Sequence, residues 1–452
     1  MSDFRVGFCR MAVNPPDGIY VRGYFRKRYS EGILDDIEIV SMALSSREVT
    51  ALVISMDICG FYGSAATTLS AVVAEATGLA PENIFLHATH THTGPLVGED
   101  AEYVTDIERA YFAFIKEKIV EAARKALDDR QPARMGHAVA AAPKLAFIRR
   151  YRMKDGSVQT NPGVGNPDIA GPIGQPDHRV NVLRFDRADG RTVLLVNYGN
   201  HPDTISGCRL SADWPGFLRR SLESIVPNCS CIFLNGAEGD VNHINVDLKP
   251  GEFSHIGPQG GEARYAWSRY MGQSLACAVL QVLGSIETAE VTSLKCLQRH
   301  IQVPANLPAP EELPEAHRIY SLYQQGRLDE LASSPRYGSD MQRVTMIAKA
   351  KRMVKLENGP EYFDMILHGI AVDDAVLVGI PGEPFTGIGL GLKDTADWNI
   401  VLPVCNTGVA MGYFPMQDAY DEGGYEAGVS RYKAGVAELM IREGRRLMED
   451  LK

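Results

Sequence analysis

The sequence contains no hydrophobic run long enough to cross a bilayer. Its longest apolar segments, such as TVLLVNYG and DDAVLVGIPG, have the length of β-strands, whereas a membrane-spanning helix needs about 20 apolar residues. The first residues, MSDFRVGFCR, are polar and charged and lack the apolar core of a secretory signal. We therefore expect no transmembrane segment and a cytoplasmic location.

Basic runs and paired cysteines are missing as well. The formal net charge is -10, and neither a run of basic residues nor a basic amphipathic helix is evident, which disfavours nucleic acid as a partner. None of the 8 cysteines forms a Cys-x-x-Cys pair, so zinc held by cysteines is not expected, and the pattern predicts buried free thiols in a reducing compartment. A small-molecule substrate is the expected partner, and the oligomeric state stays open.

Strand-like and helix-like segments follow one another along the chain. A strand pair over 37–59, a helical segment ending at Gly78 and a third strand, NIFLHATHTH, form a βαβ-like unit. Further expected elements are strands at 134–141, 179–186 and 192–199, and helices at 107–129, at 261–285 and from about Arg431 onward. The predicted fold class is α/β, with a mixed β-sheet core flanked by helices and the active site at strand ends.

The segment 306–358 differs from its surroundings. It is charged and helical, has prolines clustered at its start, and carries none of the motifs described below. We expect a single catalytic domain over 1–452, with 306–358 as a helical insertion within it.

The stretch LHATHTHTGP, residues 86–95, contains three of the 11 histidines. On a strand, His90 and His92 would point to one face and His87 to the other. Neutral imidazoles placed in this way commonly begin a zinc site. Two histidines in a polar rim are the alternative, and this pattern alone does not decide between them.

Other strand ends offer the same kinds of side chain. VNYGNHPDT places His201 after an apolar strand and before a proline that favours extended backbone. VLVGIPGEPFTG delivers Glu383 after a Pro-Gly turn, and LNGAEGDVNHIN is a further glycine-rich exit. Each could be an ordinary loop. Together they favour a site, because α/β folds collect ligands at strand ends and a His, His, Glu set suits a catalytic zinc.

With these motifs the chain resembles the catalytic domain of the neutral/alkaline (non-lysosomal) ceramidase family. ATHTHTGP, NHPDT, EGDVN, PGEPFT and MGYFPMQDAYDEGGYEAG occur in the family's order and span residues 6 to about 432. The resemblance implies a zinc ion held by His90, His201, Glu383 and Tyr413. It also implies active-site roles for His92, which handles substrate or proton, and for Tyr425 and Arg149, with Arg150 as a one-residue alternative to Arg149.

The activity that the resemblance implies is zinc-dependent hydrolysis of an amide, with a role in lipid metabolism. Zinc would lower the pKa of its water to about 7, and the water would attack an N-acyl carbonyl. Tyr425 could stabilise the oxyanion, and His92 could pass a proton to the leaving group. An esterase or lactonase acting on a small polar substrate, and a non-catalytic zinc-binding relative, are the alternatives.

The chain departs from the family in several places. Asn242 stands where the family has a serine, and an amide can hydrogen-bond but cannot act as a nucleophile. We also expect the family's C-terminal immunoglobulin-like domain to be absent. The charges of RRYRMKDG suggest a polar or anionic substrate, or equally a solvated loop, so ceramide is one of several candidate substrates.

Overall fold

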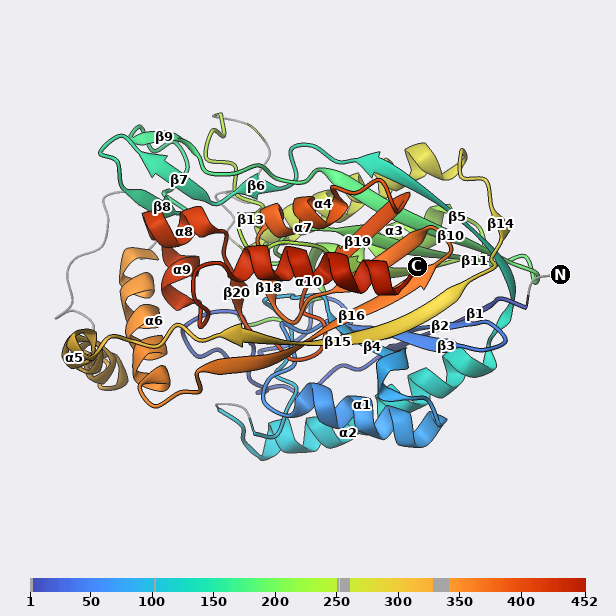
Figure 1. Cartoon of the computed structure of the whole chain (residues 1–452), viewed down its shortest axis with the longest axis horizontal. Coiled ribbons are helices and arrows are strands. Elements are labelled where there is room, and N and C mark those ends of the chain that lie inside the picture. The colour runs from blue at the N-terminus through green and yellow to red at the C-terminus, as the bar shows by residue number, and fades with distance from the viewer. Residues whose placement is uncertain (1–2, 101–102, 250–251, 253–260, 328–340) are drawn as a thin grey trace.

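The computed structural model describes residues 3–100, 103–249, 252, 261–327 and 341–452. Two β-sheets form its centre (Figure 1). The larger sheet has the order β12-β11-β10-β5-β1-β2-β3-β4, with β14 beside β5. Its strands are β1 Arg5–Ala12, β2 Glu38–Ser45, β3 Thr50–Met56, β4 Ile84–Ala88, β5 Gln131–Ala141, β10 Arg179–Arg187, β11 Thr192–Tyr198, β12 Cys229–Asn235 and β14 Ala289–Glu290.

The second sheet has the order β15-β16-β17-β19. Its strands are β15 Leu294–Pro304, β16 Tyr362–Val372, β17 Ala375–Gly379 and β19 Ile400–Val404. Three small sheets lie outside these two. They comprise β6 Phe147–Ile148 with β13 Val241–Asn242, β18 Glu383–Pro384 with β20 Tyr413–Phe414, and β7 Arg150–Met153 with β8 Val158–Thr160 and β9 Ile169–Pro172. Both large sheets mix parallel and antiparallel pairs, as in β3 with β4 and β2 with β3.

Helices cover the outer faces of the two sheets. The larger sheet is covered by α1 Ala65–Thr77, α2 Asp106–Asp128, α3 Asp213–Ile225 and α4 Gly261–Leu283. The second sheet is covered by α7 Thr386–Lys393 and α10 Val436–Asp450. The remaining helices are α5 Leu313–Gln324, α6 Met341–Leu356, α8 Gln417–Glu422 and α9 Tyr425–Val429. Among the helices described, none combines the length and the apolar character needed to span a membrane.

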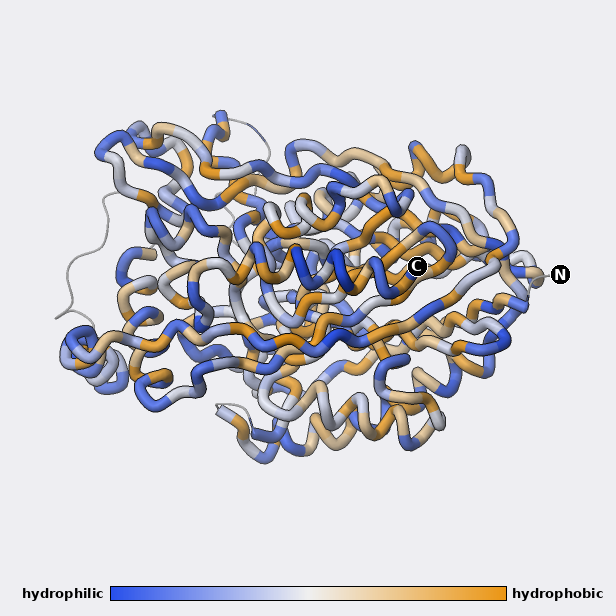
Figure 2. Tube along the Cα trace, viewed as in Figure 1, coloured by the Kyte–Doolittle hydropathy of each residue, from blue (hydrophilic) through white to orange (hydrophobic). Residues whose placement is uncertain are grey.

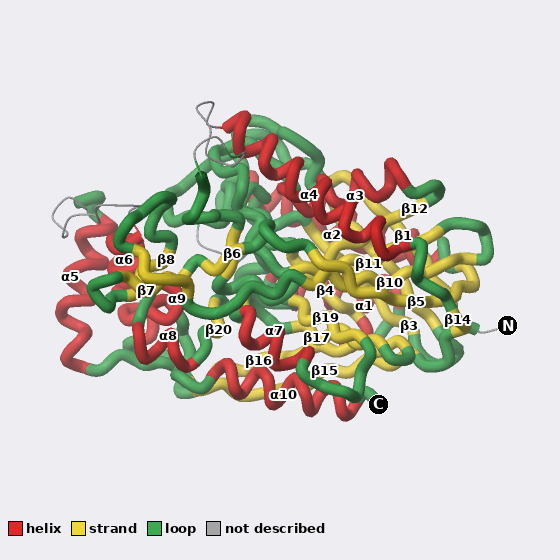
Figure 3. The backbone as a smooth tube through the Cα atoms, turned by 90° about the horizontal axis from the view of Figure 1, so that it is seen from above, coloured by secondary structure: helices red, strands yellow, loops and turns green. Residues whose placement is uncertain are grey.

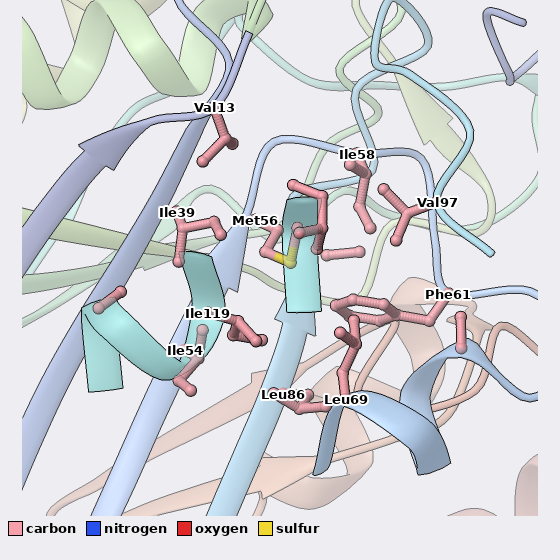
Figure 4. Packing of buried hydrophobic residues seen from close by; sticks show 14 of the residues in the cluster. Val13, Ile39, Ile54, Met56, Ile58, Phe61, Leu69, Leu86, Val97 and Ile119 are labelled. Atoms are coloured by element: carbon pink, nitrogen blue, oxygen red, sulfur yellow. The ribbon is translucent and has the colours of Figure 1, made fainter. Parts of the chain in front are cut away.

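The layering follows from the period-two alternation of apolar residues in the strands. In β2, Val40 and Met42 pack into the core between the two sheets, whereas Ile39 and Ala43 pack against α1 and α2. Figure 4 shows this outer layer, in which Ile39 contacts the cluster that contains Leu69 and Ile119. In Figure 2 hydrophobic residues are frequent along the central strands and hydrophilic residues are frequent in the outer turns. The α/β class predicted from the sequence is confirmed.

The βαβ unit forms as its sequence predicts. Helix α1 ends at Gly78, whose φ of 73° is the left-handed conformation typical of a helix C-cap. Helix α2 begins with a capping box in which the Thr105 and Glu108 side chains each bond the other's backbone N–H. Strands β3 and β4 are parallel, as the motif requires.

The strand prediction for NIFLHATHTH is wrong beyond residue 88. Strand β4 ends at Ala88, and His90 has a φ of 71°, a left-handed conformation that cannot continue a strand. The N–H groups of His90 and His92 donate to the carbonyls of Ile58 and Pro202 instead of to a neighbouring strand. The two histidines therefore lie in a loop, and the strand geometry that we expected for them does not exist.

The strand ends lead into one region of loops. Figure 3 shows these loops gathered between the large sheets and the group formed by α5, α6, α8 and α9. Helices α5 and α6 lie within 306–358, as predicted, while residues 328–340 of this segment lie outside the described residues. That the segment is an insertion remains a prediction.

Candidate metal centre

Three side chains from three different strand exits converge in the loop region. His90 follows β4, His201 follows β11 and Glu383 follows β17. The Oε2 atom of Glu383 is 3.5 Å from Nε2 of His90 and 3.3 Å from Nε2 of His201. Both histidines are buried, and the carboxylate is nearly so. We call these three residues the ligand group.

The backbone fixes which ring nitrogen each histidine turns toward Glu383. Nδ1 of His90 donates to the carbonyl of Cys59 at 2.6 Å. Nδ1 of His201 donates to the carbonyls of Glu238 and Val241 at 2.9 and 3.0 Å. Because a carbonyl can only accept, Nδ1 carries the proton in both rings, and Nε2 is the nitrogen that faces Glu383. Metal-binding histidines are oriented by the same kind of partner.

The ligand group fits a divalent metal ion. Ligand atoms about 2.0–2.2 Å from a tetrahedral zinc ion are about 3.3–3.6 Å from one another, and the two measured separations fall in this range. Oε2 of Glu383 is buried and has no hydrogen-bond partner. Burial would raise the pKa of Glu383, but the neighbouring His90 and His201 outweigh it and hold this pKa well below its usual value. An ionised carboxylate oxygen between two imidazoles requires positive charge beside it, which a metal ion or a proton on an imidazole can supply.

A second group of possible ligands is less suited to a metal. Cys59, His90 and His92 also offer atoms within 4.8 Å of one another. The nitrogen of His90 closest to the thiol is Nδ1, at 3.9 Å from Sγ, and this nitrogen is already bonded to a carbonyl. The thiol accepts a hydrogen bond from the Tyr62 hydroxyl at 3.3 Å. Nδ1 of His90 and the thiol of Cys59 therefore already have other hydrogen-bond partners.

His92 lies beside the ligand group and is held differently. Its Nε2 is 3.2 Å from Nε2 of His90, but its Nδ1 is buried without a hydrogen-bond partner. Its ring instead makes an edge contact with Tyr24, with ring centroids 5.2 Å apart. Burial lowers the pKa of His92 well below its usual value, and His90 adds to this effect. His92 therefore presents a neutral imidazole next to the ligand group.

Two tyrosines complete one wall. Tyr413 is the direct neighbour of Glu383 in the β18–β20 pair. Its ring stacks on His201 with centroids 6.5 Å apart and meets the edge of Tyr425 at 5.8 Å. Burial raises the pKa of both phenols, and the charge of Glu383 adds to it. Both hydroxyls are therefore protonated in the absence of a metal.

Of the two candidate arginines, Arg149 lies next to the ligand group and Arg150 does not. Arg149 donates to Glu426 at 2.7 Å and to the carbonyl of Gly239 at 2.8 Å, while its Nη1 lies 3.3 Å from Nε2 of His201. Arg150 turns away and forms ion pairs with Asp418 and Glu422. Because Glu426 is fully buried and compensates the charge of Arg149, this guanidinium is not a free receptor for an anion.

Asn242 has its polar atoms engaged within the surrounding loops. Its amide nitrogen donates to Asn161 at 2.9 Å, and its oxygen accepts the N–H of Ile244 at 2.9 Å. The side chain is fully buried. This arrangement connects the loop around Asn161 with the one that follows β13.

Glu238 is a residue that sequence reasoning missed. Its Oε1 lies 4.0 Å from Nε2 of His90, and its carboxylate accepts hydrogen bonds from Asn235, Cys405 and Asn406. Burial raises the pKa of Glu238, while His90 and His201 counter this shift. The only signal in the sequence was an acidic residue in the glycine-rich exit of β12. With Glu383 it supplies two carboxylates, which match the charge of one divalent ion.

The fold and the ligand group together define an α/β protein with a buried two-histidine, one-carboxylate site at its strand ends. The crystal structure of neutral ceramidase from Pseudomonas aeruginosa superposes with a TM-score of 0.73 at 18% sequence identity, over 100% of this chain and 75% of that chain. A structure described as ceramidase complexed with C2 gives a TM-score of 0.70 at 17% identity, over 100% and 76% of the two chains. No protein-family model and no curated protein matches the sequence. The resemblance to neutral ceramidases is thus confirmed at the level of the fold.

Proposed function

We propose that the chain is a zinc-dependent hydrolase that cleaves the amide bond of an N-acyl compound. The observation that carries this proposal is the convergence of His90, His201 and the unpaired Oε2 of Glu383. The neutral ceramidase fold supports an amide as the scissile bond, because a ceramidase acts on the N-acyl bond of a lipid. Ceramide is one candidate substrate among such compounds.

In this proposal His90, His201 and Glu383 hold the zinc ion, and Tyr413 is placed to join them. Zinc supplies a Lewis acid that polarises a carbonyl and lowers the pKa of water to about 7. The two backbone-bonded Nδ1 atoms keep the imidazoles in the tautomer that binding requires. The hydroxyl of Tyr413 normally titrates near 10, so it joins as a weak ligand or loses its proton on metal binding.

Amide hydrolysis forms a bond between the acyl carbon and a water oxygen, breaks the carbon–nitrogen bond and delivers a proton to the leaving amine. We assign the proton transfer to His92, because its imidazole is neutral, buried and next to the ligand group. No hydrogen bond to Nδ1 holds the ring. The Tyr425 hydroxyl is assigned to stabilise the oxyanion, and Arg149, whose charge Glu426 compensates, is assigned to lie beside the substrate next to His201. Asn242 contributes structure rather than chemistry.

The cysteines support the proposed cytoplasmic location. All eight are free thiols, as predicted, although only Cys59, Cys231 and Cys405 are buried. A chain whose thiols are unpaired suits a reducing compartment.

The test is turnover of a substrate panel by the full chain before and after chelation. The panel contains ceramide, short N-acyl amides, and esters and lactones with the same acyl groups. We expect amide turnover that a chelator abolishes and added zinc restores. Turnover that is insensitive to the chelator would contradict the zinc mechanism, and turnover of esters alone would reject the amide assignment.

A further inference from the structure

Two arginine-rich segments flank the site, and they differ in how their charges are compensated. In the segment 149–152, Arg149, Arg150 and Arg152 each form an ion pair with a glutamate or aspartate of the α8–α9 region. The segment 22–28, RGYFRKR, carries four cations and no acidic residue. Sequence reasoning gave this second segment no role.

The segment 22–28 lies directly over the catalytic side of the site. Gly23 has a φ of 112°, and a Cβ at this position would lie 2.6 Å from Cγ of His92. The Tyr24 ring meets the edge of the His92 ring at 5.2 Å, and the Phe25 ring meets Tyr425 at 6.5 Å. Three consecutive residues therefore contact the two side chains that we assign to proton transfer and oxyanion stabilisation.

Arg28 holds this segment in place without a carboxylate. Its guanidinium donates to the carbonyls of Gly207, Arg22 and His92 at 2.6, 2.6 and 2.7 Å. It is buried, and its charge lies over the Tyr24 ring at 4.3 Å. Carbonyl dipoles stabilise the cation but do not cancel its charge, and the Asp203 carboxylate, which acts on Tyr24 and His92, is itself paired with His243.

Arg22 is half-buried close to the surroundings of His90, whereas Arg26 and Lys27 of the same segment are exposed. Its guanidinium lies 4.1 Å from the centre of the Tyr62 ring, and the Tyr62 hydroxyl in turn contacts Cys59 beside His90. Nε of Arg22 is buried without a hydrogen-bond partner. Among the residues that the structure describes, no carboxylate lies within ion-pairing distance of it, and the groups that act on it are Tyr62, Cys59 and Tyr20.

We propose that Arg22 binds an anionic group of the substrate, a carboxylate or a phosphate, and so directs the site to charged N-acyl compounds such as N-acyl amino acids. The proposal rests on the proposed function and names the substrate class for it. A guanidinium held on an aromatic face without a carboxylate partner suits an oxyanion, which accepts its hydrogen bonds. The carboxylates of Glu383 and Glu238 would together balance the charge of one divalent ion, so the positive charge of Arg22 is available to the substrate.

The experiment compares three substrates that share one acyl chain. These are N-octanoylglycine, N-octanoyl phosphoethanolamine and the neutral N-octanoylethanolamine, each assayed for kcat/KM with the zinc-loaded full chain. We expect wild-type protein to prefer one of the two anions over the neutral amide by at least about 10-fold. The preferred anion identifies the group as carboxylate or phosphate.

Arg22→Met, Arg22→Lys and Arg152→Met separate a specific role from a general charge effect. Arg22→Met should lower the anion-to-neutral ratio of kcat/KM about 10- to 100-fold, as expected for a lost charged hydrogen bond. Arg22→Lys should restore part of it, because it keeps the charge and loses the paired donors. Arg152→Met, which removes an ion-paired and exposed arginine, should leave the ratio unchanged. An equal loss on all three substrates, or no preference for an anion in the wild type, overturns the proposal.

Equilibrium dialysis distinguishes failure of this proposal from failure of the proposed function. If no amide is hydrolysed but N-octanoylglycine or the phosphate analogue binds more tightly than the neutral amide, and Arg22→Met abolishes the difference, the anion site stands and the hydrolase assignment falls. If the neutral amide is hydrolysed with zinc and all three compounds bind equally, the hydrolase assignment stands and the role of Arg22 falls.

Discussion

The histidine in strand β4 and the two histidines in the loop that follows it differ in the partners of their ring nitrogens. His87, in the strand, has both ring nitrogens engaged by neutral groups, because Nδ1 bonds Ser55 at 2.9 Å and Nε2 accepts the N–H of Asn235 at 3.0 Å. His90, in the loop, has one nitrogen bonded to a carbonyl and the other turned toward two carboxylates. His92 has Nδ1 without a partner.

The two environments have opposite effects on the pKa of a buried histidine. Burial lowers the pKa of His87 to about 3, so this ring stays neutral and serves only to join β4 to β3 and β12. Burial also opposes the charge of His90, but Glu238 and Glu383 outweigh it and raise the pKa of His90 well above its usual value. A metal ion or a proton can satisfy the same demand for positive charge at His90.

The largest effect is expected for His90→Ala. Removing one of two imidazole ligands should abolish zinc binding and reduce turnover to the level of the chelated protein. His201→Ala is the matched variant from another strand exit and should behave in the same way. Activity that survives in either variant would show that the ligand group is assigned wrongly.

His92→Ala should lower kcat by about 10²–10⁴-fold, the usual contribution of positioned proton transfer. The loss should be smaller for substrates whose leaving groups need little protonation, such as activated esters. Turnover of an amide and an activated ester by the same variant measures this difference. A loss of equal size on both substrates would contradict a proton-transfer role.

Glu238→Gln should weaken zinc binding by about 10- to 100-fold without abolishing it. This is typical of groups that contact a metal-binding side chain without binding the metal themselves. The change keeps the size of the side chain and removes a charge 4.0 Å from Nε2 of His90. Competition with a chromophoric chelator measures the affinity. Glu108→Gln alters a buried carboxylate that caps α2 and should leave zinc affinity as in the wild type.

His87→Ala should have the smallest effect on the site. It leaves the buried Asn235 N–H without an acceptor and removes the hydrogen bond to Ser55, so it should lower the free energy of unfolding by about 1–3 kcal/mol. Urea unfolding measures this loss. Turnover per folded molecule should stay close to that of the wild type, and a large fall in it would place His87 in the site.

The same histidine predicts part of the pH dependence of stability. The unfolded chain binds a proton at His87 near pH 6.5, while the folded chain does so only near pH 3. The contribution of neutral His87 is therefore present above pH 6.5 and is lost as the pH falls toward 3. Between pH 7 and 5 this amounts to about 2 kcal/mol, so the wild type should lose that much more stability than His87→Ala over this interval.

Much of the candidate site could be predicted from the sequence because its residues follow apolar segments that are recognisable as strands. His201 and Glu383 lie within a few residues of the ends of β11 and β17, and the fold brings such ends together. The conformation of His90 was not predictable, since a left-handed residue after Ala88 leaves no mark in the hydrophobic pattern. Glu238 and Arg22 were missed because their roles depend on partners far away in the chain.

The most direct test of the account is the zinc content of His87→Ala, His90→Ala and His92→Ala, measured by metal analysis of the folded proteins beside the wild type. We expect about one zinc ion in the wild type, in His87→Ala and in His92→Ala, and none in His90→Ala. Equal loss of zinc from His90→Ala and His92→Ala would contradict the assignment of zinc binding to His90 and of proton transfer to His92. It would favour a three-histidine site in which Tyr413 is not a ligand.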